Sequence, residues 1–179
     1  MIAPSSLNLL RIVQVRLDQF AELTGNVIAW LVLFMMLVTS LVVFMRYLLN
    51  TGSIALQESV IYMHGLVFLL GAAYALKRQA HVRVDILYQK FSPRTQALVD
   101  LLGTLLFLIP FAVFVTWVSI EYVSFSWALR ESSPEPGGLP GVFLLKTLIP
   151  VMSITLLLQG LSELIRNALI VFGSDEDLL

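Results

Sequence analysis

The sequence predicts an all-α membrane protein, with four transmembrane helices and an N-terminal amphipathic helix that lies at the membrane surface. The first reason is composition, because 58% of the 179 residues are hydrophobic and only 13% are charged, against roughly 45–50% and 25% in soluble domains. The second is that charged residues divide the chain into four long, nearly uncharged stretches. The third is that basic residues collect on one side of those stretches. We expect a single membrane domain over residues 1–179.

Each of the four stretches is long enough to cross a bilayer as a helix. The expected spans are residues 23–45, 59–76, 101–120 and 141–162. The first contains 23 uncharged residues, which would form a helix roughly 34 Å long, and a span needs about 17–25 residues. The fourth carries Lys146 near its start, where the aliphatic stem lets the ammonium group reach the membrane surface.

The segment before the first span, residues 5–22, has the pattern of an amphipathic helix. Its apolar residues recur at close to helical spacing, with charged and amide residues mostly between them. A helix of this kind lies in the plane of the membrane surface. The apolar run that follows begins too late and is too long for a signal peptide, so we expect it to remain as an anchor.

The distribution of basic residues predicts how the chain is oriented in the membrane. Eight of the eleven lysines and arginines lie in the N-terminal arm, in the loop between the second and third spans or in the C-terminal tail. Short cytoplasmic loops retain positive charge. We therefore expect both termini in the cytoplasm, with residues 47–57 and about 121–145 on the outer side.

Several classes of function lack the residues that they need. A net charge of −1 supplies no basic surface for nucleic acid, and the absence of cysteine excludes disulfides, thiolate metal sites and cysteine nucleophiles. Bis-histidine haem ligation needs two imidazoles at one depth, whereas the two histidines, His64 and His81, are 17 residues apart. The sequence contains no catalytic constellation or phosphate-binding loop, so we expect no enzyme, cofactor or metal site.

His64 is the one titratable residue well inside an expected span. It lies six residues, or roughly 9 Å, from the outer end of the second span. We interpret it as a neutral histidine that hydrogen-bonds to a neighbouring helix or reaches the membrane surface. A proton-carrying or ligand-binding role stays open.

Small residues and prolines predict the local shape of two spans. Gly71 and Ala75 are four residues apart and share one face of the second span, which allows another helix to approach closely. Pro110, midway along the third span, lacks an amide hydrogen and favours a kink. Aromatic residues between 117 and 127 form an interfacial belt and imply that this helix continues past Glu121.

Charged residues near the ends of the spans are candidates for structural ion pairs or for contacts with another subunit. Arg46 and Glu58 flank the first outer loop, and we expect them to pair across it, worth about 0–1 kcal/mol, unless each is solvated separately. His81, Arg83 and Asp85 alternate with apolar residues where the second span reaches the cytoplasm. They would tie the loop to helix ends or to a neighbouring protein, or act as a positive-inside anchor.

Taken together, these residues resemble a known family, the small membrane subunit (DctQ-like) of tripartite ATP-independent periplasmic (TRAP) transporters. The resemblance extends over nearly the whole chain, and its most specific part is the run from Gly71 to Asp85. The residues that carry it are Arg46-Tyr47, Glu58, Gly71-Ala72-Ala73-Tyr74-Ala75-Leu76, Ala80-His81-Val82-Arg83-Val84-Asp85, Pro150 and Gln159.

The resemblance implies a subunit of the bacterial inner membrane that is not an enzyme and works with two partners. A large multi-span membrane subunit (DctM-like) would bind substrate and sodium and move in an elevator-like manner. A periplasmic substrate-binding protein (DctP-like) would deliver an organic acid, and the small subunit would be a static scaffold. The motif of residues 136–140 is similar to a subgroup with 2-oxo or hydroxy acid substrates. The candidate docking contacts for the binding protein, with a solvated loop as the alternative, are Glu121, Arg130, Glu131 and Glu135.

Two other classes of function stay open at this point. A self-sufficient small exporter that acts as a homodimer predicts a carboxylate in the first span, and residues 23–45 contain none. A cytochrome-like electron carrier predicts a Soret band in the purified protein.

Overall fold

The described part of the chain is all-α, with no strand, as expected. The structure is a computed structural model that describes residues 4–80 and 88–173. Four helical runs are long and apolar enough to cross a membrane, which confirms the predicted number of spans. The main helices are α1 (Pro4–Leu48), α2 (Ile54–Lys77), α3 (Pro93–Gly103), α4 (Ile109–Ala128) and α5 (Val142–Phe172).

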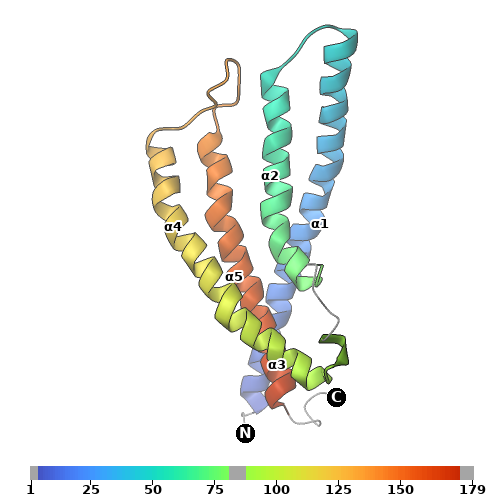
Figure 1. The fold of residues 1–179 in the computed structure, drawn as a ribbon, viewed down its shortest axis with the longest axis vertical. Helices are drawn as coiled ribbons and strands as arrows, with labels where there is room; N and C mark the ends of the chain where they lie inside the picture. The colour runs from blue at the N-terminus through green and yellow to red at the C-terminus, as the bar shows by residue number, and fades with distance from the viewer. Residues whose placement is uncertain (1–3, 81–87, 174–179) are drawn as a thin grey trace.

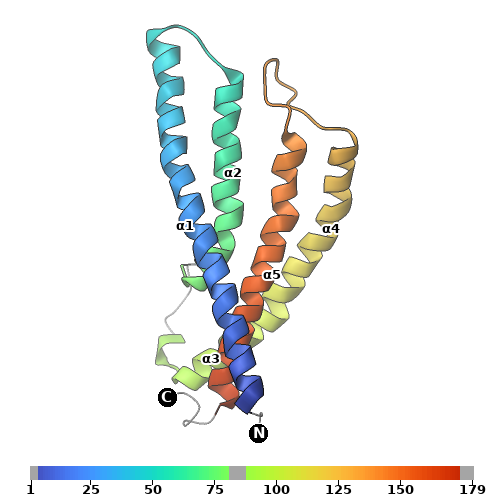
Figure 2. The same cartoon turned by 180° about the vertical axis from the view of Figure 1, so that it is seen from behind.

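The helices form a row rather than a closed bundle. α2 packs between α1 and α5, while α4 packs against α5 on the side away from α2. Figures 1 and 2 show two hairpins, α1–α2 and α4–α5, which meet near the chain termini and diverge toward the loops. We call these the terminal end and the loop end. Near the terminal end α1 also contacts α5, and α3 packs on α5.

α1 joins the predicted surface arm and the first span in one continuous helix. It contains 45 residues, which corresponds to a length of about 67 Å. In the arm, Leu10, Gln14, Leu17, Asp18 and Ala21 are more buried than the residues between them, because they face the other helices. The arm is thus packed on the bundle along one side, and its position at a membrane surface stays a prediction.

The third span is longer than expected and is distorted next to Pro110. α3, a five-residue π-helix (Thr104–Leu108) and α4 follow one another without a break, and Figure 1 shows the run bending here. A proline ring clashes with the carbonyl group four residues earlier, and a π-helical turn relieves this crowding. Gly160 of α5 lies against the turn: an added Cβ would stand 2.8 Å from Leu108 Cδ2.

Gly25 of α1 lies directly against α2, a contact that was not predicted from the sequence. A Cβ at Gly25 would overlap the ring of Tyr74. Gly71 also faces α1, but a Cβ there would be 3.5 Å from Ile28 Cδ1, an ordinary contact. The face that carries Gly71 therefore packs inside this chain, and the glycine that this interface requires is Gly25.

Replacing Gly25 by alanine should destabilise the protein. The new methyl group would push the Tyr74 ring out of its place, and overpacking of this kind costs about 1–3 kcal/mol. The control is Gly103→Ala, because Gly103 is also helical and a Cβ there meets nothing within 4 Å. Thermal unfolding in detergent should show a lower Tm for Gly25→Ala and an unchanged or higher Tm for Gly103→Ala. Equal effects would contradict the packing argument.

Candidate functional site

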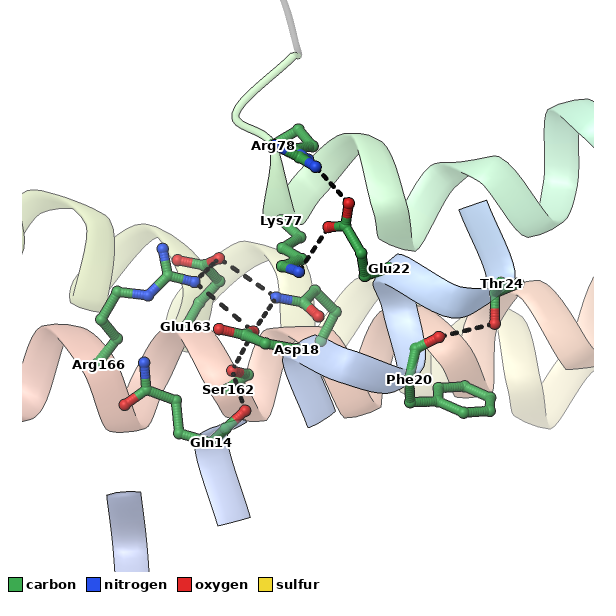
Figure 3. Close-up of polar contacts among 11 residues, drawn as sticks. Gln14, Asp18, Phe20, Glu22, Thr24, Lys77, Arg78, Ser162, Glu163 and Arg166 are labelled. Atoms are coloured by element: carbon green, nitrogen blue, oxygen red, sulfur yellow. Dashed lines mark hydrogen bonds and ion pairs between the residues drawn. The ribbon is translucent and has the colours of Figure 1, made fainter. Parts of the chain in front are cut away.

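Polar side chains from three helices converge near the terminal end, in what we call the charged junction. Figure 3 shows that they come from α1, from the last turn of α2 and the residue after it, and from α5. Three are acidic and three are basic, so their formal charges cancel. The residues of the charged junction are Asp18, Glu22, Lys77, Arg78, Gln159, Ser162, Glu163 and Arg166.

Glu22 connects α1 to the end of α2. One carboxylate oxygen pairs with Lys77 Nζ at 2.6 Å, and the other accepts a hydrogen bond from the guanidinium of Arg78. Arg78 caps α2 and is largely exposed, and the carboxylate of Glu22 raises its pKa above the ordinary value. Glu22 is thus shared between the last residue of α2 and its cap.

Asp18 connects α1 to α5 in a more buried setting. Its Oδ1 accepts hydrogen bonds from Ser162 Oγ at 2.7 Å and from Gln159 Nε2 at 3.0 Å. Ser162 and Gln159 are 0% and 1% exposed, so no water competes for these donors. Arg166 pairs with Glu163 at 2.6 Å and lies 3.9 Å from Asp18. Because buried polar groups are costly when unpaired, these bonds favour one alignment of α1 on α5.

A second group of polar contacts, which we call the loop clamp, holds the loop between α4 and α5. Glu58 of α2 accepts hydrogen bonds from the hydroxyl of Ser133 and from the backbone N–H of Leu139 at 2.6 Å. Glu131 accepts from Lys146 Nζ of α5 at 2.6 Å and from Ser126 Oγ of α4 at 2.5 Å. Residues 131–139 are therefore tied to three helices, so this loop is ordered despite its prolines and glycines.

The carboxyl group of Glu131 is held in its ionised form. Hydrogen bonds from Lys146 and Ser126 lower its pKa below the ordinary value of 4.5. A group whose pKa is lowered by folding stabilises the folded state above its unfolded pKa, and this contribution is lost as pH falls through the folded value. The Glu131 part of the loop clamp is therefore complete near neutral pH and weakens below about pH 4.5.

The prediction that Arg46 and Glu58 form an ion pair was wrong. Helix α2 begins at Ile54, so Glu58 lies one turn inside it and faces the loop after α4 rather than the loop after α1. Both carboxylate oxygens of Glu58 are engaged there. Arg46 lies in the exposed last turn of α1 and forms no ion pair within the described residues.

The remaining candidate contact residues from the sequence do not form one cluster. Arg130 lies with its guanidinium carbon 5.8 Å and 5.6 Å from the ring centroids of Trp127 and Phe143. Glu121 and Glu135 are exposed at the loop end, whereas Glu131 is engaged in the loop clamp. His81, Arg83 and Asp85 lie outside the described residues.

His64 does not form the hydrogen bond to a neighbouring helix that was one of the two interpretations. It is exposed on α2, and its ring stacks on Phe68 with centroids 6.3 Å apart. Within the described ranges, no group of three or more His, Cys, Asp or Glu side chains is arranged to hold a metal ion.

Most contacts of the charged junction were not predicted from the sequence. It ended the fourth span at residue 162 because Glu163 is charged, yet α5 continues to Phe172. The available signal was the spacing of Gln159, Ser162, Glu163 and Arg166, which places polar groups on one side of a helix. Asp18 was one of the charged residues of the expected surface arm, and no local pattern relates it to a residue more than 140 positions away.

A comparison with known families shows which family the chain belongs to. Residues 35–169 match the family described as tripartite ATP-independent periplasmic transporters, DctQ component. The chain belongs to this DctQ family. No curated protein and no solved structure gives a significant match.

Membership of the DctQ family places the four apolar helices in the inner membrane. This DctQ chain is a multi-pass inner-membrane protein and the small subunit of a TRAP transporter. The family is one of transporter components rather than of enzymes. The match begins at residue 35, inside α1, so the half of α1 that carries Asp18 and Glu22 precedes it.

Removing the Asp18 carboxylate should loosen α1 from α5. Asp18→Ala leaves the donors of Ser162 and Gln159 without their acceptor in a buried contact, at a cost of about 1–3 kcal/mol. The matched control is Gln19→Ala, because Gln19 is the next residue and is exposed. In detergent, Asp18→Ala should lower the Tm and speed cleavage of the arm by protease, whereas Gln19→Ala should do neither. A stable, protease-resistant Asp18→Ala variant would contradict this role.

Proposed function

We propose that this DctQ protein is the scaffold subunit of a sodium-coupled TRAP transporter that imports an organic acid. A DctP-like periplasmic protein delivers the acid, and a DctM-like large subunit transports it. The observation that supports the scaffold role is that both ends of the helix row are tied by contacts within the chain. The charged junction connects α1, α2 and α5, and the loop clamp connects α2, α4 and α5.

The placement of charge supports a scaffold over a transport pathway. A pathway through the chain would need ionisable groups deep in the membrane. Residues 23–45, 59–76 and 101–120 contain no Asp, Glu, Lys or Arg. The carboxylates of the charged junction and the loop clamp lie outside these three stretches and are already bound to partners in the same chain. They are therefore engaged in fixing helices rather than in binding a solute.

A fixed row of helices suits work beside a moving subunit. An elevator-like motion needs a part of the transporter that resists displacement in the bilayer. Long apolar helices with aromatic residues at the membrane surfaces resist tilting and vertical movement. The edge helices α1 and α4 supply such surfaces, because most of their large hydrophobic side chains are exposed.

The orientation that we propose places the loop end in the periplasm and both termini in the cytoplasm. The basic residues support it, because most of them lie at the terminal end. The ordered loop then faces the binding protein with Glu135 exposed at its tip and Arg130 held over two aromatic rings. Charged groups at the rim of an interface mainly set its orientation and association rate.

Reconstitution tests the scaffold function. Proteoliposomes that contain this chain, the large subunit and the binding protein should accumulate radiolabelled acids under an inward sodium gradient. The probes are a panel of mono- and dicarboxylates that includes lactate and pyruvate. Omitting this chain should reduce uptake at least about tenfold, because the large subunit loses its fixed support. Uptake or efflux by this chain alone, as the homodimeric exporter requires, would contradict the proposal.

Cysteine labelling tests the orientation and the docking surface together, because the natural sequence contains no cysteine. Ser132→Cys places a thiol in the exposed part of the loop, and Asn8→Cys places one on the exposed side of the arm. A membrane-impermeant maleimide should label Cys at 132 in cells with a permeable outer membrane, and Cys at 8 only after lysis. Saturating binding protein should slow labelling at 132 severalfold. The reverse accessibility would contradict the orientation, and unaltered labelling would contradict the docking surface.

A further inference from the structure

The face of α2 that its neighbours leave open is a narrow strip, formed by Ile61, His64 and Phe68. Ile61 and Phe68 are 58% and 69% exposed, whereas the residues between Ile54 and Lys77 that flank the strip are half-buried or buried. The spacing of three and four residues aligns the strip along one face of α2. Since α1 and α5 cover the two sides of α2, the strip is the part of this helix that remains open.

His64 places a polar side chain on this strip within the apolar part of the spans, as Asn26 does near the inner end of the first span. Thr39 and Ser40 of α1 are also exposed there, but their hydroxyls donate to Met35 O at 2.7 Å and Met36 O at 2.9 Å. An imidazole has a donor and an acceptor nitrogen, and neither forms a hydrogen bond within the described chain; its recorded contact is the ring of Phe68.

Acyl chains cannot satisfy such a group. A polar side chain that faces hydrocarbon without a hydrogen-bond partner is unfavourable, because it has lost its bonds to water and gained none in return. His64 lies roughly 9 Å from the outer end of the expected span, so its short side chain has the apolar part of the membrane around it unless protein covers it. Most exposed large side chains of α1 and α4 are Leu, Val, Phe and Trp, which lipid covers without penalty; Glu121 of α4, toward the loop end, is an exposed exception.

We propose that the strip of Ile61, His64 and Phe68 is the contact surface for a membrane-spanning helix of the large transporter subunit. That helix presents a hydrogen-bonding side chain to His64 and apolar side chains to Ile61 and Phe68. The proposal rests on the proposed function, because it requires this chain to have a partner in the membrane. It assigns the partner to α2 and leaves the edge faces of α1 and α4 to lipid.

Photo-crosslinking in the assembled transporter tests the surface. A benzophenone amino acid is placed at Ile61 or Phe68, and for comparison at Phe34 of α1 or Phe114 of α4, which are 54% and 59% exposed. Irradiation of native membranes should join the large subunit to positions 61 and 68 at least about fivefold more than to positions 34 and 114. Preferential crosslinking through α1 or α4, or of two copies of this chain through α2, would overturn the proposed surface.

Substitution of His64 tests the hydrogen bond. Because interhelical hydrogen bonds in membranes are modest, His64→Leu should weaken association with the large subunit about three- to tenfold, measured in detergent by the fraction that co-purifies at several protein concentrations. His64→Gln keeps a donor and an acceptor and should restore most of the association. An equal association for all three proteins would overturn the role of His64. Failure of the natural chain to associate with the large subunit would instead overturn the proposed function.

Discussion

The arrangement of the helices depends on two acidic residues of α1 that bind two different helices. Asp18 accepts from Ser162 and Gln159 of α5, and Glu22 pairs with Lys77 at the end of α2. The two carboxylates are four residues apart and leave α1 on one face, so α2 and α5 must both lie on that face. Apolar contact alone does not select such an alignment in a bilayer, because lipid covers apolar side chains equally well. Directional hydrogen bonds in a buried contact do select it, because misalignment leaves donors unpaired.

This constraint explains why four spans form a row and not a closed bundle. A closed bundle would bury the outer faces of α1 and α4 against each other, whereas here α4 packs on α5 and leaves a broad apolar face exposed. In water such faces would cause aggregation. In a membrane they cost nothing, and a row presents more lateral surface to lipid and to a neighbouring subunit than a bundle of the same mass. The shape thus follows from where the polar contacts were placed and suits a component whose family works in an assembly.

The sequence predicted the helices well and the contacts between them poorly. The number of spans followed from the length of uncharged stretches, which is a local property, and Pro110 marked the distorted turn at Thr104–Leu108. The contact of Glu58 with Leu139 and that of Asp18 with Ser162 were missed because each joins residues more than 80 positions apart. Glu163 also does not end its helix: α5 continues to Phe172, and Arg166 pairs with that carboxylate where α5 packs on its neighbours.

The charged junction alone would not fix the angle between the two hairpins. Two hairpins joined only near the terminal end could open and close about that junction, because they diverge toward the loops (Figures 1 and 2). The loop after α4 connects the two hairpins at this end. Its Leu139 donates to Glu58 of the first hairpin, and its Glu131 pairs with Lys146 of the second. The lowered pKa of Glu131 keeps that carboxylate charged at neutral pH. With attachments at both ends, a change in the angle between the hairpins must break buried or charge-assisted hydrogen bonds, which are among the stronger ones in proteins. The loop after α4 therefore limits changes in the angle between the two hairpins.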